Sequence, residues 1–114
     1  MNTKRGGIYL ANLDPVVGRE IAKTRPVIVV SNDKNNAYSG TVTVLPITSR
    51  NTGKIYPFEV YLPKGTGNLS QNSRVKADQI RTIDNRRIVK FIGQINAGEL
   101  DQVENAVKIH LDLI

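Results

Sequence analysis

Short runs of strand-forming residues alternate with turn-forming clusters along most of this chain, and that spacing restricts it to a small β-sheet fold. In the stretch FEVYL, Phe58, Val60 and Leu62 alternate with Glu59 and Tyr61, which is the two-residue period of a half-buried strand. Similar runs occupy residues 8–13, 27–31, 42–48 and 73–82, between clusters of turn-forming residues. No internal repeat or linker interrupts them, so they predict a small antiparallel barrel.

The apolar spacing changes at the end of the chain, where we expect a helix. Apolar residues recur there at helical intervals, at Leu100, Val103, Val107, Leu111 and Ile114. Asn96, followed three residues later by Glu99, forms the pattern of a capping box at the start of such a helix. The prediction is a mainly β fold of the α+β class, with a C-terminal helix that covers the barrel.

The length and composition bound the class of protein. A chain of 114 residues fits one domain, which we assign to residues 1–114. The sequence has no cysteine, no apolar run approaching the roughly 18 residues of a membrane helix, and no leader of signal-peptide form. These features favour a reduced, cytoplasmic protein with no membrane partner.

The positive charge is concentrated in the first ninety residues. The chain carries a formal net charge of +6. Residues 1–90 hold fifteen of the sixteen Lys and Arg residues against six acidic ones, a net charge of +9, whereas residues 91–114 carry −3. A basic surface of this kind favours an anionic partner, and it belongs to the β-rich part of the chain rather than to the terminal helix.

The segment KTRPVIVVSND places Arg25 and Pro26 at the start of an apolar strand. An antiparallel hairpin across residues 33–40 pairs residues whose numbers sum to about 73, which brings Arg25 near Thr48. Pro46 cannot donate to the sheet, so it marks a bulge or an edge. Pro26 also holds Arg25 in an extended backbone. We therefore expect the rigidly placed cation of Arg25 and the hydroxyl of Thr48 to lie at the same end of the barrel.

The sequence offers little for metal or cofactor chemistry. One histidine and no cysteine exclude the common zinc patterns and a catalytic cysteine. The GTG stretch at residues 65–67 lacks the Gly-Lys-Ser/Thr of a P-loop, and no spacing of carboxylates argues for magnesium. We therefore predict no metal and no organic cofactor, and we interpret His110, beside the apolar stripe of the helix, as a packing or interface residue.

Four stretches of the chain resemble the MazF/PemK toxins of bacterial toxin-antitoxin modules. They are RGGIYLANLDPVVGREIAKTRPVIVVSND, LPITS, VKADQIRTIDNRRI and the terminal helix, and together they span nearly the whole chain. The resemblance implies an SH3-like antiparallel β-barrel of the plasmid-maintenance toxin type with a C-terminal α-helix. It also implies a homodimer that cuts single-stranded RNA, mRNA in particular, at short sequences without a metal, and that a cognate antitoxin holds inactive.

The resemblance also assigns site residues. The Arg-Pro arginine of the family is Arg25 and its Pro-x-Thr threonine is Thr48, and these two are expected to be catalytic. One branch of the family has a histidine at the position of Arg19 and an arginine at that of Lys76, so this chain fits the branch that relies on the Arg and Thr pair. Residues expected to bind RNA or support the site are Arg5, Arg19, Glu20, Ser49, Lys76, Asp78, Gln79 and Arg81.

Cleavage by the 2'-hydroxyl of the RNA itself needs a base, an acid for the leaving 5'-oxygen, and donors for the charge growing on the phosphate. Arg25 suits the last task, because its planar fork makes paired hydrogen bonds to phosphate oxygens, and Thr48 can supply a further donor. An arginine pKa above about 12 makes Arg25 a poor base. Asp78, Glu20 and water are the alternatives for proton removal.

Other interpretations of the same residues compete with this one. A related toxin of the same fold poisons DNA gyrase, but its functional tail carries a tryptophan, and this chain has none. A noncatalytic RNA-binding barrel is disfavoured only by the intact Arg25 and Thr48. The structural alternatives are a solvated or salt-bridged Arg25, a Thr48 bonded to the local backbone, and an Asp78 paired with Lys76.

Overall fold

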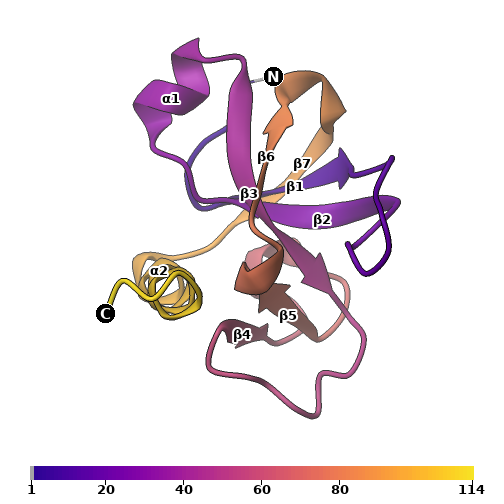
Figure 1. Ribbon diagram of the computed structural model, residues 1–114, viewed down its shortest axis with the longest axis vertical. Helices are drawn as coiled ribbons and strands as arrows, with labels where there is room; N and C mark the ends of the chain where they lie inside the picture. Colours follow the sequence, from indigo (N-terminus) through magenta and orange to yellow (C-terminus); the bar gives the residue numbers. More distant parts are fainter. Residues whose placement is uncertain (1) are drawn as a thin grey trace.

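The computed structural model describes residues 2–114, which form an antiparallel sheet and two α-helices (Figure 1). The strands are β1 (Gly7–Asn12), β2 (Thr24–Val29), β3 (Thr41–Thr48), β4 (Glu59–Leu62), β5 (Ser73–Lys76), β6 (Arg81–Asp84) and β7 (Ile88–Gln94). The helices are α1 (Asp33–Tyr38) and α2 (Ala97–His110), with 3-10 turns η1 (Thr66–Asn68), η2 (Ala77–Gln79) and η3 (Asn85–Arg87). The predicted mainly β fold with a C-terminal helix is confirmed.

Strand β3 organises the sheet, because it pairs with three other strands. The strand order is β4-β5-β3-β2-β1-β7, and β6 also pairs with β3. Along one edge β3 pairs with β2, and along the other its first half (residues 41–44) pairs with β6 and its end, Ile47 and Thr48, with β5. Pro46, which has no N–H to donate and is expected from the sequence to mark a bulge or an edge, pairs with Val27 of β2, and on its other side it lies where β3 changes from β6 to β5.

The predicted register of the β2–β3 hairpin is confirmed. Val27 lies opposite Pro46 and Val29 opposite Val44, so paired residue numbers sum to 73. The connection is not a simple loop, however, because residues 33–38 form the short helix α1. Its first turn is capped by Asn32, whose side chain accepts a hydrogen bond of 2.8 Å from the N–H of Asn35.

The expected single strand over residues 73–82 is wrong, because η2 breaks it into β5 and β6. Val75 pairs with Ile47 and Arg81 with Val44. The chain thus advances six residues from Val75 to Arg81 while its partner strand retreats only three, from Ile47 to Val44. A continuous antiparallel strand cannot accommodate three extra residues, so the turn at residues 77–79 takes them up.

Helix α2 closes the core from one side. Val103 and Ala106 join Leu45, Ile47 and other buried residues in one apolar cluster, and α2 packs against η2 and β4. A second cluster forms around β1, β2, β3 and β6. The helix begins with the predicted capping box but ends at His110, so Leu111 and Ile114 lie past its end, 46% and 71% exposed, rather than on its apolar stripe.

The beginning of the chain is tied to this helix by Arg5. The Arg5 guanidinium donates hydrogen bonds to the carbonyl of Val30 and to the carboxylate of Glu104, which lies 99 residues further along the chain. The ion pair therefore joins the segment before β1, the end of β2 and helix α2. None of the helices within residues 2–114 combines the length and the apolar character needed to span a membrane.

The capping box supplies a test of how α2 contributes to stability. The N–H of Glu99 donates to the Asn96 side chain at 2.8 Å, and the Asn96 N–H donates to the Glu99 carboxylate at 2.9 Å. We expect Asn96→Ala to lower the free energy of unfolding by about 1 kcal/mol, and the melting temperature by roughly 4 °C. Thermal melts should show no such loss for Asp101→Ala, an exposed position in the same helix. An Asn96→Ala protein that melts like wild type would contradict this role.

Candidate active site

Arg25 lies near the start of β2, opposite Ala11 of β1. Its Nε donates a hydrogen bond of 3.1 Å to the carbonyl of Ala22, which fixes the direction of the side chain. Within residues 2–114 its two terminal nitrogens have no hydrogen-bond partner. The guanidinium is therefore fixed through Nε, while the N–H groups of its two terminal nitrogens remain available to a ligand. The alternative of a salt-bridged Arg25 is not what the structure contains.

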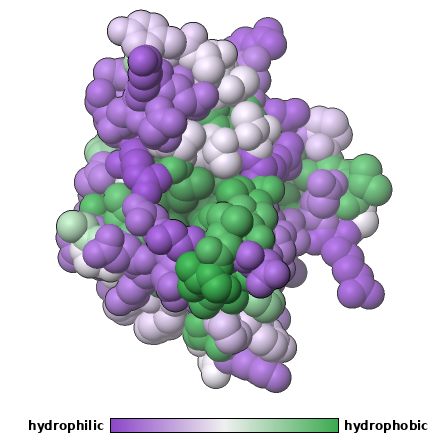
Figure 2. Space-filling model, turned by 60° about the vertical axis from the view of Figure 1, so that its left-hand side comes forward, coloured by the Kyte–Doolittle hydropathy of each residue, from purple (hydrophilic) through white to green (hydrophobic). Residues whose placement is uncertain are grey.

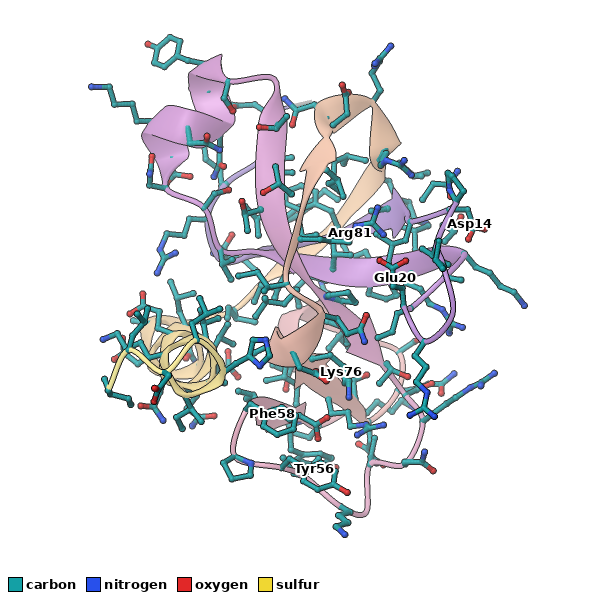
Figure 3. All side chains as sticks on the ribbon, in the orientation of Figure 1. Asp14, Glu20, Tyr56, Phe58, Lys76 and Arg81 are labelled. Atoms are coloured by element: carbon teal, nitrogen blue, oxygen red, sulfur yellow. The ribbon has the colours of Figure 1, made fainter. Side chains whose placement is uncertain are left out.

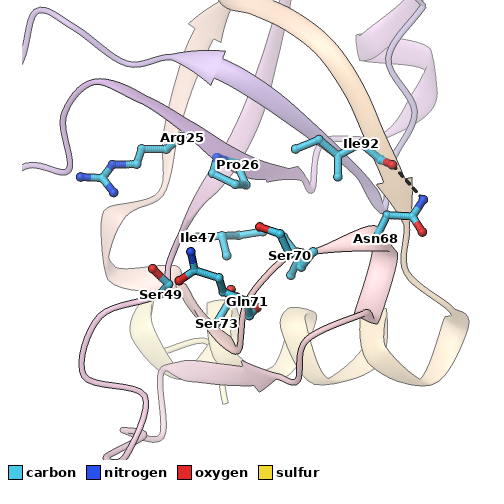
Figure 4. Close-up of a pocket in the computed structure, with 10 residues that line it drawn as sticks. Arg25, Pro26, Ile47, Ser49, Asn68, Ser70, Gln71, Ser73 and Ile92 are labelled. Carbon is cyan, nitrogen blue, oxygen red and sulfur yellow. Dashed lines mark hydrogen bonds between the residues drawn. The ribbon is translucent and has the colours of Figure 1, made fainter.

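Beside Arg25 the surface is hollowed into a pocket of about 210 Å³ (Figure 4). Arg25 lies at one end of the pocket, while at the other the Asn68 side chain donates a hydrogen bond of 3.0 Å to the carbonyl of Ile92. The lining residues are Arg25, Pro26, Ile47, Ser49, Asn68, Leu69, Ser70, Gln71, Ser73 and Ile92. Hydroxyls and amides share this lining with four apolar residues, and Arg25 is the one cation in it, which suits a ligand that carries both an anionic group and apolar surface.

Thr48 ends β3 at the same end of the hairpin, between Ile47 and Ser49 of the pocket wall. Its Oγ1 accepts a hydrogen bond of 3.2 Å from the N–H of Arg50. The local backbone contact foreseen as an alternative is therefore present, but it uses the hydroxyl as an acceptor. The hydroxyl proton is still available for donation to another group.

The loop between β1 and β2 carries Arg19 and Glu20, both exposed. Glu20 accepts a hydrogen bond from the N–H of Val17, which closes a turn inside the loop. Gln79 holds the loop from outside, because its side chain accepts from the N–H of Ile21 at 3.2 Å and donates to the carbonyl of Arg19 at 3.5 Å. Of the predicted supporting residues, Gln79 thus positions the segment that leads to Arg25.

Glu59 occupies a position that the alternating pattern of FEVYL assigned to the outward face, but its side chain is completely buried. It forms ion pairs with Lys76 Nζ at 2.8 Å and Arg74 Nη1 at 3.0 Å. Burial by itself raises the pKa of Glu59, but the hydrogen bonds from Lys76 and the Tyr56 N–H and the charge of Arg74 outweigh it, so its pKa lies below the usual 4.5. Lys76 is therefore held by a buried charge.

The remaining predicted residues are spread over the neighbouring surface. Asp78 lies 3.5 Å from Lys76 Nζ, which is the ion pair weighed as an alternative to a catalytic role. Arg81 donates a hydrogen bond of 3.1 Å to the carbonyl of Leu13 and so supports the start of the β1–β2 loop. Arg5 lies in a different hollow, together with Glu104, Val107 and Lys108, and its contacts join structural elements.

His110 is exposed and its ring lies 6.2 Å from that of Phe58, so its interpretation as a packing or interface residue stays a prediction. In the part of the chain that the structure describes, no three His, Cys, Asp or Glu side chains gather in a way that could hold a metal ion.

Residues 4–111 match the family described as the PemK-like, MazF-like toxin of type II toxin-antitoxin systems. The chain belongs to this family. It is 44% identical over 115 residues to the endoribonuclease MazF9 of Mycobacterium tuberculosis, an alignment that covers 96% of this chain and 97% of the relative.

Two solved structures from Deinococcus radiodurans show the same fold as this PemK/MazF family member. The crystal structure of MazF superposes with a TM-score of 0.85, 31% identity and 98% coverage of both chains. A MazE–MazF crystal structure matches with a TM-score of 0.76 and 28% identity, over 97% of this chain and 96% of the other.

Sequence reasoning about this PemK/MazF domain missed two groups of residues. The first is the polar wall opposite Arg25, formed by Asn68, Ser70, Gln71 and Ser73, which the sequence presents only as a turn-rich stretch. The second is the pair formed by Glu59 and Arg74. A signal for it exists in the sequence, since one acid sits on β4 and two bases sit two residues apart on β5, but the register that joins Glu59 to Lys76 had to be known first.

The buried Glu59 should make stability depend on pH. Its pKa is lower in the folded chain than in the unfolded one, so between those two values the unfolded chain binds more protons. The stabilisation is therefore complete above about pH 4.5 and is lost as the pH falls through the folded value. We expect Glu59→Gln to remove this acid-sensitive step and to cost about 3 kcal/mol at pH 7, because two cations lose their buried partner.

Urea unfolding at a series of pH values from 7 to 3 measures both effects. Asp101→Asn, at an exposed position of α2, is the matched control and should leave the pH profile unchanged. A Glu59→Gln protein with wild-type stability and the wild-type acid profile would show that the buried ion pairs are not what the structure indicates.

Proposed function

We propose that this chain is an endoribonuclease toxin that cleaves single-stranded RNA, with Arg25 and Thr48 at the reacting phosphate. The observation that carries the proposal is the free outer fork of Arg25, at the edge of a pocket lined by Ser49, the residue that follows Thr48 in the chain. Membership of the PemK/MazF family supports it, and so does the relative named an endoribonuclease. The net charge of +9 on residues 1–90 adds attraction for a phosphate backbone.

In this proposal the 2'-hydroxyl of the RNA attacks the adjacent phosphorus, and the 5'-oxygen of the next nucleotide leaves. Negative charge grows on the non-bridging oxygens as the new bond forms, and the guanidinium of Arg25 donates two hydrogen bonds to them. Thr48 donates its hydroxyl proton to the same phosphate, since its Oγ1 is oriented by the N–H of Arg50. These groups stabilise charge without a metal ion. The proton from the attacking hydroxyl passes to Glu20, Asp78 or water, and the leaving 5'-oxygen takes up a proton from water to become the 5'-hydroxyl.

We further propose a cytoplasmic homodimer that a cognate antitoxin inhibits. The family is a toxin family of type II toxin-antitoxin systems, and one similar structure is a complex of MazE with MazF. An acidic antitoxin segment suits the basic surface that takes RNA. Apolar surface available for association lies at the end of α2, where Figure 2 shows a green patch and where Ile109, Leu111, Leu113 and Ile114 are exposed.

The first test of this function is cleavage in the presence of EDTA. We expect pure protein to cut a long defined RNA with EDTA present, leaving a 2',3'-cyclic phosphate and a 5'-hydroxyl, because the internal 2'-oxygen is the nucleophile. End mapping and phosphatase sensitivity of the products measure this outcome. A magnesium requirement or 5'-phosphate products would refute the mechanism, and binding to gyrase without RNA cleavage would favour the rival toxin activity.

The second test separates Arg25 and Thr48 from structural roles. Arg25→Ala should slow single-turnover cleavage by about 100-fold to 1,000-fold while the protein still folds and binds RNA, and Arg25→Lys should stay impaired because a point charge cannot reproduce the fork. Thr48→Val keeps the shape and removes the hydroxyl, so we expect slower cleavage of bound RNA. An unchanged single-turnover rate with a lowered melting temperature would remove Thr48 from the site.

A further inference from the structure

A hollow of about 490 Å³, the second candidate RNA site after the Arg25 pocket, lies beside β4 and β5 and is lined by Asn51, Lys54, Tyr56, Arg74 and Lys76. The resemblance to the toxin family drew attention only to Lys76 among these residues. Figure 3 shows Lys76 together with Tyr56 and its neighbour Phe58 in this part of the molecule. The hollow therefore combines three cationic side chains with an aromatic ring.

The two cations on β5, Arg74 and Lys76, are held in place by a buried carboxylate beneath the surface of the hollow. The buried carboxylate of Glu59 accepts from both Lys76 and Arg74, and Arg74 Nε donates a further hydrogen bond of 2.9 Å to the carbonyl of Arg50. With Lys54 added, three positive charges face two negative ones, the buried Glu59 and Asp78, which lies 3.5 Å from Lys76 Nζ. The hollow keeps a positive excess and holds two of its cations in place before any ligand arrives, which favours an anion.

The ring of Tyr56 is also held in place by packing against another aromatic ring. Tyr56 stacks on Phe58 with ring centroids 5.6 Å apart and planes 5° from parallel, and Phe58 in turn contacts His110 of α2. Lys54 Nζ lies over the Tyr56 ring, 5.1 Å from its centre, and 42% of Tyr56 is exposed, so a base that stacks there takes the place of the flexible Lys54 side chain. A supported, exposed aromatic ring beside cations is suited to stacking a nucleobase.

The residues that line this second hollow are neighbours, in the sequence and in the sheet, of residues at the Arg25 pocket. Thr48 pairs with Arg74 in the β3–β5 ladder, Ser49 lines the Arg25 pocket, and Asn51 lines the second hollow. Arg50, between Ser49 and Asn51, donates its N–H to Thr48 and accepts from Arg74. A single strand that crosses Thr48 therefore meets the hollow within a short distance on one side of the reacting phosphate.

We propose that this hollow is a subsite for a nucleotide neighbouring the cut, with its base stacked on Tyr56 and its phosphate held by Lys54, Arg74 and Lys76. The inference rests on the proposed endoribonuclease function and extends it to a defined place for the flanking nucleotide. An acidic peptide could satisfy the cations but would leave the Tyr56 ring without a stacking partner. RNA accounts for both the cations and the aromatic ring, because it carries phosphates and bases.

The absence of tryptophan from the chain allows a direct test, since Tyr56→Trp introduces the only tryptophan fluorophore. The protein is prepared with Arg25→Ala to prevent cutting, and it is titrated with an RNA that wild type cleaves. Stacking should quench the fluorescence in step with binding. The matched control is Tyr38→Trp, at an 84% exposed residue of α1, at the opposite end of the molecule from β4 and β5, and it should not respond (Figure 1).

A cleavage assay on substrates with one abasic position beside the cut then identifies the nucleotide. For wild type, one such position should lower cleavage at limiting RNA by roughly 5-fold to 100-fold, and Tyr56→Ala should lower the cleavage of intact RNA to a similar extent. The two losses should not add, because both remove the same stack. Tyr56→Phe should restore cleavage, since stacking needs the ring and not the hydroxyl.

The outcomes separate this subsite from the underlying function. A wild-type protein that cuts no RNA would overturn both. A wild-type protein that cuts, combined with unquenched fluorescence of the Tyr56→Trp protein or with losses that add fully, would overturn the subsite alone. Quenching of the Tyr56→Trp protein by an acidic peptide and not by RNA would assign the hollow to a protein partner and overturn the proposal as well.

Discussion

The pairing of β3 with three strands is the constraint on which the rest of this structure depends. Val42 and Val44 belong to one apolar cluster, and Leu45 and Ile47 belong to the other, so the strand is covered on both faces near its middle. Its two edges are also occupied, by β2 on one side and by β6 and then β5 on the other. Each of these strands is placed by β3, and the strand ends at Thr48.

The part of the fold that the sequence could predict is the part fixed by local patterns. The turn-rich connection between two apolar runs indicated the register of β2 with β3, and the Asn96 and Glu99 pair indicated the start of α2. Both features depend on residues close together in sequence, where spacing and geometry are directly related. The positions of Arg25 and Thr48 at one end of the hairpin followed from that register, whereas their chemical roles came from the family resemblance.

What the sequence could not predict depends on partners that are distant along the chain. The alternation in FEVYL correctly made Val60 and Leu62 buried and Tyr61 exposed, but it could not show that Glu59 is buried between two cations from β5. The break at η2 likewise arises because β3 changes partners at Pro46, which requires knowing all three strands. Arg5 was assigned to the RNA surface on resemblance, while its observed contacts are with Val30 and Glu104.

The ion pair between Arg5 and Glu104 has a consequence for how the protein is made. A ribosome releases the chain from its beginning, so Ile8 emerges long before Val103 and Ala106, which complete the same apolar cluster. Until α2 has left the ribosome, that cluster lacks its cover and Arg5 lacks its carboxylate partner. The apolar cluster that supports the end of β3 is therefore completed only when synthesis has reached Val103 and Ala106, which makes the folding of this core a late event in translation.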